Sequence, residues 1–186
     1  MVPHDPTPDT RLATLADRAE ITALLDRYAR ALDDRALPDR ALETTLPGLL
    51  TPDVTVGPPA DDHSGLSEAT RHLTESLASF GATQHSYTNY LIDLDGDEAA
   101  IRANSFAACV LVDSGDLRTT GGVLTAEATR TPYGWRLRSV TIAPTWETTA
   151  SLPSGKREKP SGTEDASTET ADSPAEEPGS GEPETP

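Results

Sequence analysis

The sequence predicts one α+β domain in which helices come first and an antiparallel sheet follows. Up to about residue 80, apolar side chains recur at spacings of three and four, which is typical of amphipathic helices. Beyond that point they alternate with polar side chains, as in strands that bury one face. Three turn motifs, Asp95–Asp97, Ser114–Asp116 and Pro132–Gly134, divide this second part into four strands that would pair as a meander.

The first helix is predicted over residues 15–34, because one of its faces is apolar throughout. A second helix is expected over residues 38–50, with Pro38 suited to its first turn and Pro47-Gly48 bending or ending it early. The apolar face of the first helix carries Ile21, Leu24, Leu25, Tyr28 and Leu32.

A short strand is predicted at residues 53–56, followed by a loop over residues 57–65 that is rich in glycine and proline. A third helix is expected over residues 66–80, with Gly81 closing it as a C-terminal cap. The apolar face of this helix would carry Leu66, Ala69, Leu73 and Leu77.

Four long strands complete the predicted domain, and Gly121-Gly122 is expected to introduce a bulge or bend into the third of them. These strands cover residues 83–95, 98–113, 117–131 and 135–146. The more apolar face of the second strand, which we take as the inward one, reads Ile101, Ala103, Ser105, Ala107, Cys109 and Leu111.

Both ends of the chain differ in composition from this domain, which we assign to residues 12–149. Residues 1–11 contain three prolines and are expected to form a disordered arm. Residues 150–186 are rich in Pro, Glu, Ser and Thr, and from Ser151 onward they hold nine acidic residues, three basic residues and one leucine. Such a segment cannot bury enough apolar surface to offset its ordering entropy, so a disordered acidic tail is expected.

The charge balance excludes several classes of partner. A net charge of -16 argues against sequence-independent binding to nucleic acid and against anionic membrane surfaces, since both require clustered basic residues. No apolar run approaches the roughly 20 residues that span a bilayer, and no secretory signal is recognisable at the N-terminus. These features predict a cytoplasmic protein that binds neither nucleic acid nor membranes.

Four segments of the chain form a recognisable set: DRAEITALLDRYARALDDR, TPDVTV, ATQHSYTNYLIDLDGDEA and RTPYGWRLRSVTIAPTW. They resemble the SnoaL-like domains of the nuclear transport factor superfamily, especially its polyketide cyclase-like and scytalone dehydratase-like members. The resemblance implies a cone-shaped α+β barrel, in which N-terminal helices pack inside a strongly curved, mainly antiparallel sheet and leave a deep pocket. The superfamily includes dehydratases, cyclases, isomerases, epoxide hydrolases and non-enzymes, so the fold alone does not identify the reaction.

The resemblance also implies an acid/base pair. In scytalone dehydratase-like proteins, a histidine in a Gln-His motif on the first long strand acts as base or acid, and an aspartate near the end of the first helix orients it. Gln84-His85 and Asp33 occupy these places here, although Asp34 is an equally acidic alternative and a strand histidine is often only structural. Tyr28, one helical turn before Asp33, is expected on the core side as a catalytic phenol or a packing residue.

Residues two apart in a strand share a face, so His85, Tyr87 and Asn89 are expected to point the same way. Tyr87 could hydrogen-bond a carbonyl or phenol oxygen, and Asn89 could position a substrate oxygen unless it is a strand-edge or bulge residue. Such a set suits proton abstraction next to a carbonyl, elimination of water or proton-assisted ring closure. None of these reactions requires a metal or an organic cofactor.

The inner strands depart from the scytalone dehydratase pattern. Where that enzyme has a second pocket histidine, only Ser105 and Cys109 are available, and Cys109 also reads as a small buried hydrophobe. Leu124 and Ala126 replace the Tyr and Asp of a Gly-x-Tyr-x-Asp motif. We therefore expect a large apolar pocket that favours a polyketide- or terpenoid-like ligand. Its lining would include Ala103, Ala107, Leu124, Ala126 and Trp146.

The remaining histidines give no sign of a metal site. His63, in the loop rich in glycine and proline, and His72, on the third helix, are expected to be exposed to solvent. No histidine pair has the His-Glu-x-x-His spacing, and the acidic residues show no calcium-loop pattern. We therefore expect no metal and no cofactor.

Three functions are compatible with these features. The first is a cofactor-independent cyclase, dehydratase or isomerase that acts by acid/base catalysis on a hydrophobic, polyketide-like secondary metabolite. The second is a non-catalytic small-molecule-binding or accessory protein, which the apolar Leu124 and Ala126 favour. The third is a limonene-type epoxide hydrolase, whose Asp–Arg–Asp set would have to include Arg102 or Arg118.

A homodimer is also expected, because superfamily members commonly pair through the outer face of the sheet. Phe106, Val110 and Val140 could supply the apolar contact area there.

Overall fold

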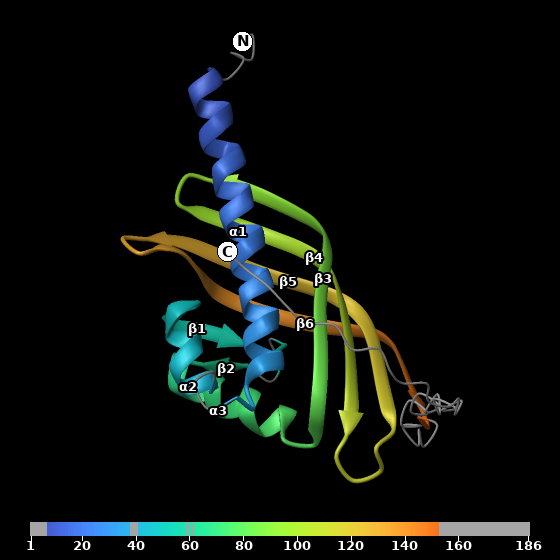
Figure 1. Cartoon of the computed structure of the whole chain (residues 1–186). Coiled ribbons are helices and arrows are strands. Elements are labelled where there is room, and N and C mark those ends of the chain that lie inside the picture. Colours follow the sequence, from blue (N-terminus) through green and yellow to red (C-terminus); the bar gives the residue numbers. More distant parts are fainter. Residues whose placement is uncertain (1–6, 38–40, 59, 61, 153–186) are drawn as a thin grey trace, which may run out of the picture. The chain divides into compact units, whose positions relative to one another are not determined.

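A long helix, α1 (Pro8–Asp34), lies across one face of a curved six-stranded sheet (Figure 1). The computed structural model describes residues 7–37, 41–58, 60 and 62–152. All of these belong to one unit of the chain, Met1–Pro153. The expected α+β class, with helices before a long antiparallel meander, is confirmed.

The sheet is mixed and does not close into a barrel. Its strand order is β2-β1-β6-β5-β4-β3, and the last four strands form the predicted antiparallel meander. β1 adds to β6 in parallel, and β2 pairs with β1 in antiparallel orientation. The bounds are β1 (Leu50–Val56), β2 (His63–Ser64), β3 (Phe80–Asp95), β4 (Glu98–Leu111), β5 (Leu117–Thr131) and β6 (Gly134–Ala150).

Helix α1 begins earlier than predicted, because Thr7 caps it and Pro8 suits its first turn. The arm predicted over residues 1–11 therefore overlaps the start of α1, while residues 1–6 and the tail from residue 153 lie outside the described residues. The first turns of α1 project beyond the sheet (Figure 1), and the buried residues of the helix start at Ile21. Within the described ranges, no helix combines the length and apolar character needed to cross a membrane.

Two shorter helices pack beside β1. α2 (Leu42–Thr45) passes directly into the 3-10 helix η2 (Leu46–Gly48), so the chain leaves the helical conformation near Pro47-Gly48 as expected. α3 (Leu66–Leu77) ends earlier than predicted, and Gly81 lies in β3 rather than capping the helix. The predicted first residues of the second helix, 38–40, lie outside the described part of the chain.

The core forms where α1 faces the sheet. The helix contributes large side chains, including Ile21, Leu24 and Leu25, all of them fully buried. The facing strands contribute large side chains such as Leu124 and Leu137 and also several alanines, whose short side chains allow the helix to lie close to the strands. The buried alanines of the sheet are Ala99, Ala103, Ala126 and Ala128.

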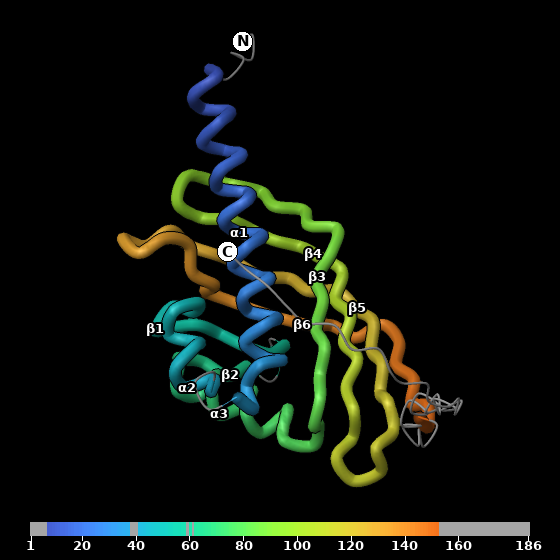
Figure 2. Tube along the Cα trace, viewed as in Figure 1, coloured from blue at the N-terminus to red at the C-terminus, as the bar shows by residue number. Residues whose placement is uncertain are grey.

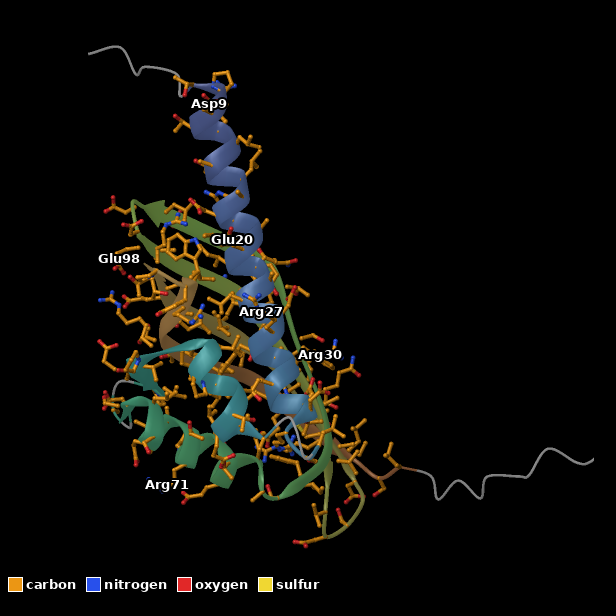
Figure 3. The ribbon with its side chains drawn as sticks, turned by 60° about the vertical axis from the view of Figure 1, so that its left-hand side comes forward. Asp9, Glu20, Arg27, Arg30, Arg71 and Glu98 are labelled. Atoms are coloured by element: carbon orange, nitrogen blue, oxygen red, sulfur yellow. The ribbon has the colours of Figure 1, made fainter. Side chains whose placement is uncertain are left out.

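An ionic contact anchors the first half of α1 to the sheet. Asp17 accepts hydrogen bonds from the Arg130 guanidinium at 2.6 Å and from the Trp135 indole at 3.2 Å. The Arg130 hydrogen bond lowers the pKa of Asp17, and Trp135 adds to that effect. Figure 3 shows the opposite, polar side of α1, where Arg27 and Arg30 lie exposed.

Bulges bend the long strands, which sweep around α1 in the trace of Figure 2. One extra residue in β3 separates the pairs Thr88–Asn104 and Leu91–Arg102. Another, Thr145 in β6, stands between the partners of Gly121 and Gly122, where the sequence predicted a bulge. Beyond an extra residue, the alternation of side chains shifts by one, so positions expected to point inward point outward and the reverse.

The second bulge moves Trp146 to the outer face of the sheet, where its ring lies 6.4 Å from that of Phe106 and half of the residue is exposed. The expectation that Trp146 lines the pocket is therefore wrong. Val140 is 2% exposed and faces inward, so the outer-face contact expected of it is wrong too. Val110 is partly buried.

Substitution of Gly122 tests how closely β5 and β6 approach each other at this bulge. A Cβ at Gly122 would collide with the backbone carbonyl of Ala143, whereas one at Gly121 would meet only the ring of the half-exposed Trp146. We expect Gly122→Ala to lower the free energy of unfolding by about 1–3 kcal/mol, measured by urea denaturation. Gly121→Ala should cost less, because the Trp146 ring can move outward. Equal effects of the two substitutions would contradict this account.

Candidate active site

The carboxylate of Asp33, at the end of α1, holds His85 on β3 by both its ring and its backbone. Oδ1 lies 2.7 Å from the ring Nδ1 of His85, and Oδ2 accepts the His85 backbone N–H at 2.9 Å. The His85 side chain is only 9% exposed, so this contact is largely shielded from water. Because a carboxylate accepts hydrogen bonds, Nδ1 carries the proton, and Nε2 has no hydrogen-bond partner among the described residues.

Asp33 is itself fixed by a threonine and an arginine. The Thr83 hydroxyl donates to Asp33 Oδ1 at 2.9 Å and accepts from Arg35 Nη1 at 2.8 Å. Arg35 also donates to the carbonyl oxygens of Leu32 and Phe80 at 2.7 and 2.9 Å. One guanidinium thereby ties the end of α1 to the start of β3.

The neighbouring carboxylate does not compete for His85. Asp34 forms an ion pair with Arg30 at 3.1 Å, one helical turn back along α1. Of the two adjacent aspartates, the structure therefore brings Asp33, as predicted from the resemblance, to the histidine.

His85 lines a cavity of about 240 Å³ where the end of α1 meets α3, β1 and β6. Tyr28 shares this cavity, and most of the remaining wall is aliphatic. A more open hollow of about 480 Å³ lies on the other side of the pair and includes Asp33, His85 and Tyr87. The other residues of the 240 Å³ cavity are Leu32, Val56, Gly57, Pro58, His72, Leu73, Ser76, Leu77, Val140 and Ile142.

Two tyrosines stand beside the pair in a dry environment. Burial raises the pKa of the Tyr28 phenol, so Tyr28 remains protonated at neutral pH and can donate a hydrogen bond into the cavity. Burial also raises the pKa of Tyr87, whose hydroxyl is buried without a partner among the described residues. Tyr87 shares the inner face of β3 with His85, as predicted, but lines the open hollow.

The other predicted binding residues do not line the cavity beside His85 and Tyr28. Asn89 lies in the β3 bulge with a φ of 57° and is exposed, so it does not share the face of His85 and Tyr87. Ser105 and Cys109 are buried on the inner face of β4, as expected, and burial raises the pKa of Cys109. Leu124 and Ala126 lie in the core beneath α1, together with Ala103. The helix covers the middle of the sheet and confines the cavity to one end.

Sequence reasoning missed two histidines. His72 lines the cavity, and the His63 side chain is 18% exposed, so the expectation that both are exposed to solvent is wrong. Their rings stack with centroids 3.7 Å apart. A signal for His72 exists in the sequence, because it follows the buried Ala69 by three residues and immediately precedes Leu73.

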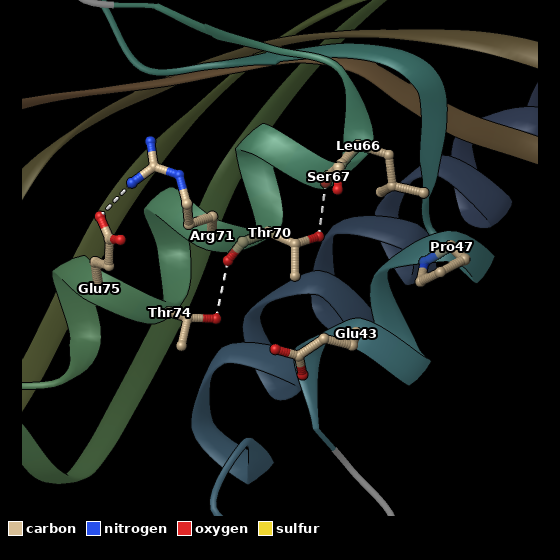
Figure 4. Close-up of a pocket in the computed structure, with 8 residues that line it drawn as sticks. All are labelled: Glu43, Pro47, Leu66, Ser67, Thr70, Arg71, Thr74 and Glu75. Carbon is tan, nitrogen blue, oxygen red and sulfur yellow. Dashed lines mark hydrogen bonds and ion pairs between the residues drawn. The ribbon is translucent and has the colours of Figure 1, made fainter.

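A larger groove runs between α2 and α3, away from His85 (Figure 4). Several of its polar groups are engaged within the fold. The hydroxyl of Thr70 donates to the Leu66 carbonyl at 2.7 Å, and Arg71 pairs with Glu75. Within the described ranges, no three His, Cys, Asp or Glu side chains come together as a metal site.

A sequence model of the SnoaL-like domain matches residues 13–141. The chain belongs to the SnoaL-like domain family. The helix-covered curved sheet described above shares the fold of a nuclear transport factor 2 (NTF2-like) superfamily protein from Salmonella enterica, with a TM-score of 0.62 at 19% identity over 78% and 99% of the two chains.

Known relatives resemble this chain over most of their own length. The uncharacterised protein Rv2910c of Mycobacterium tuberculosis is 28% identical over 134 residues, which are 68% of this chain and 84% of that protein. The Kfla4162 protein from Kribbella flavida is 29% identical with a TM-score of 0.63, and the match covers 73% and 95% of the two chains. A hexachlorocyclohexane dehydrochlorinase, LinA-type3 from Novosphingobium barchaimii, shares the fold with a TM-score of 0.65 at 17% identity, covering 75% and 94%.

Thr83 provides a test of the hydrogen bonds behind Asp33. Thr83→Val keeps the shape of the side chain but removes the hydroxyl between Asp33 and Arg35. We expect it to lower the free energy of unfolding by about 1–3 kcal/mol, because both groups lose a part-buried partner. Thr83→Ser, which keeps the hydroxyl, is the matched control in the same urea titration. A Val variant as stable as the Ser variant would contradict the assigned bonds.

Proposed function

We propose that this chain is a cofactor-independent lyase or isomerase in which His85 transfers a proton to or from carbon. The observation that carries the proposal is the contact of His85 Nδ1 with Asp33 at 2.7 Å beside an apolar cavity. With Nδ1 protonated, Nε2 carries the lone pair and is the basic atom of the ring. Asp33 then stabilises the imidazolium that forms when the ring accepts a proton.

The surroundings of His85 suit proton transfer rather than nucleophilic attack. The His85 side chain is 9% exposed, and this burial strengthens the charge interaction between Asp33 and the imidazolium. Tyr28 is held protonated by burial and can donate a hydrogen bond to a developing oxyanion. Loss of a proton to His85, followed by expulsion of a leaving group or return of the proton elsewhere, gives elimination or isomerisation. Attack of the resulting carbanion within the same molecule gives ring closure.

The cavity favours a compact apolar substrate. Its volume of about 240 Å³ lies below the roughly 300–1,000 Å³ of pockets that enclose drug-sized ligands, so the expectation of a large pocket is revised downward. A polyketide-like secondary metabolite remains the proposed class, with the reacting ring inside the cavity and the rest of a longer molecule outside. The name of one protein that shares the fold, a dehydrochlorinase, describes an elimination, which agrees with this chemistry.

The two alternatives receive less support. A non-catalytic binding module does not need an imidazole held by a carboxylate at the cavity wall, although the aliphatic lining would serve it. A limonene-type epoxide hydrolase needs an arginine between two pocket acids. Arg102 is exposed, and Arg118 is paired with Glu147 on β6.

We also propose that two copies of the chain pair through the outer face of the sheet. Phe106 and Trp146 are 41% and 51% exposed and lie together on that face. Light scattering of the full chain should give twice the monomer mass, and Trp146→Asp should shift it to the monomer. A monomeric wild-type chain would overturn the pairing.

Exchange of carbon-bound hydrogen tests the reaction without knowledge of the natural substrate. Small cyclic ketones such as 1-indanone should exchange the hydrogens next to the carbonyl for deuterium when incubated with the protein in D₂O, as followed by NMR. His85→Ala should slow this exchange by about 100- to 10,000-fold, the usual contribution of a general base. Asp33→Asn should also slow it, because the amide no longer favours the protonated ring.

Asp34→Asn is the matched control, since Asp34 adjoins Asp33 but pairs with Arg30. It should exchange the ketones at the wild-type rate. The proposed function would be refuted if the wild-type protein exchanged the hydrogens of these cyclic ketones no faster than buffer does. Equal exchange rates in the wild type and in His85→Ala would refute it too.

A further inference from the structure

Arg35, the residue that directly follows α1, is connected to His85 through two other side chains. Its guanidinium donates to Thr83 Oγ1 at 2.8 Å, and the Thr83 hydroxyl donates to Asp33 Oδ1 at 2.9 Å. The same Oδ1 lies 2.7 Å from the ring Nδ1 of His85. Three successive contacts therefore lead from a partly buried arginine to the ring of the proposed base.

The direction of these hydrogen bonds follows from the chemistry of the groups that form them. A guanidinium can only donate hydrogen bonds, and a carboxylate can only accept them. The Thr83 hydroxyl has a single hydrogen, so it accepts from Arg35 and gives that hydrogen to Asp33. Arg35 thereby commits Thr83 to the role of a donor.

The guanidinium of Arg35 is itself fixed by backbone carbonyls on both sides of the site. Nη1 also donates to the carbonyl of Leu32 at 2.7 Å, near the end of α1. Nη2 contacts carbonyl oxygens where α3 ends and β3 begins, at 3.2, 2.9 and 3.4 Å, from Leu77, Phe80 and Gly81. Because one planar group contacts three elements, its orientation is set by the fold.

Loss of the guanidinium would free the Thr83 hydroxyl. A threonine hydroxyl rotates to suit its surroundings and readily bonds to water or to nearby backbone groups. Asp33 would then lose one of the donors that place its Oδ1 against the ring of His85. A ring that is no longer held through Nδ1 can move its hydrogen to Nε2, which removes the lone pair from the basic atom.

We propose that Arg35 is a positioning residue that selects the tautomer of His85. By making Thr83 a donor, it fixes Asp33 as the acceptor for the ring, so that the hydrogen stays on Nδ1 and the lone pair on Nε2. The effect on reaction rate rests on the proposed function and deepens it, whereas the effect on the tautomer is measured without a substrate.

Two substitutions of Arg35 separate its donors from its bulk. Arg35→Met removes the donors and keeps most of the length of the side chain, whereas Arg35→Lys keeps a group that can only donate. Long-range ¹H–¹⁵N correlation spectra of the labelled full chain show which ring nitrogen of His85 carries hydrogen when the ring is neutral. The His85 signals are identified by their loss in His85→Ala. We expect hydrogen on Nδ1 in the wild type and in Arg35→Lys, and a large Nε2–H population in Arg35→Met.

Exchange of 1-indanone hydrogens in D₂O should follow the tautomer. Arg35→Met should slow the exchange at saturating ketone by up to about 100-fold, because the base is misplaced. The ketone concentration that gives half of the maximal rate should stay the same, since Arg35 does not line the cavity beside His85 and Tyr28. Arg35→Lys should restore most of the rate.

Arg130 is the matched control, because it also ties α1 to the sheet. It donates to Asp17, which precedes Asp33 by 16 residues and so lies about 24 Å away along the helix. Arg130→Met should lower the free energy of unfolding but leave the tautomer of His85 and the exchange rate unchanged. If Arg130→Met shifted both as much as Arg35→Met does, Arg35 would act only through stability and the proposal would fail.

A double variant tests whether Arg35 acts through Thr83. Thr83→Val leaves the carbonyls of Arg35 in place, and it should shift the tautomer of His85 by itself. Arg35→Met should add little to that shift when Thr83→Val is already present. Additive shifts would overturn the proposal, as would an unshifted tautomer in Thr83→Val, which decides the matter even if Arg35→Met does not fold.

The tautomer and the exchange rate also separate this inference from the proposed function. If the wild type exchanges no ketone hydrogen but Arg35→Met still moves the ring hydrogen to Nε2, the proposed function fails and the positioning role of Arg35 stands. If the wild type exchanges hydrogen and Arg35→Met keeps both its tautomer and its rate, the role of Arg35 is refuted and the proposed function stands.

Discussion

The contact between Asp33 and His85 is the constraint around which this domain is arranged. One carboxylate accepts the ring N–H and backbone N–H of His85 together with the hydroxyl of Thr83. The same atoms therefore dock the end of α1 on β3 and orient the imidazole. A substitution that weakens the contact changes the packing and the chemistry together, which is why the Thr83 hydroxyl matters to both.

The curvature of the sheet also affects both the packing of the domain and the position of its site. Extra residues in β3 and β6 bend the strands around α1 and exchange the faces beyond each bulge. α1 fills the middle of the concave face and leaves space beside His85 at the end where the helix stops. The cavity therefore lies next to the last turns of α1, which carry Tyr28 and Asp33.

Sequence periodicity predicted the elements well, because buried faces impose their spacing on helices and strands alike. It failed where single residues break that spacing. Asn89 and Trp146 both fit the alternation of inward positions, and both lie at or beyond a bulge that removes them from the inner face. Leu124 and Ala126 do face inward, but alternation cannot tell a position under α1 from one beside the cavity. His85 and Asp33 were found because the Gln-His and helix-end motifs carry information about contact that periodicity lacks.

His72 illustrates how such sites could be found without a motif. It and Ser76 stand on α3 among the buried Ala69, Leu73 and Leu77, at spacings that place all five residues on one side of the helix. A polar side chain in an otherwise apolar stripe costs free energy unless a partner satisfies it. The expectation of exposure treated His72 as a surface residue because it is polar, whereas its position in the stripe argues that its ring is partly buried and faces the cavity.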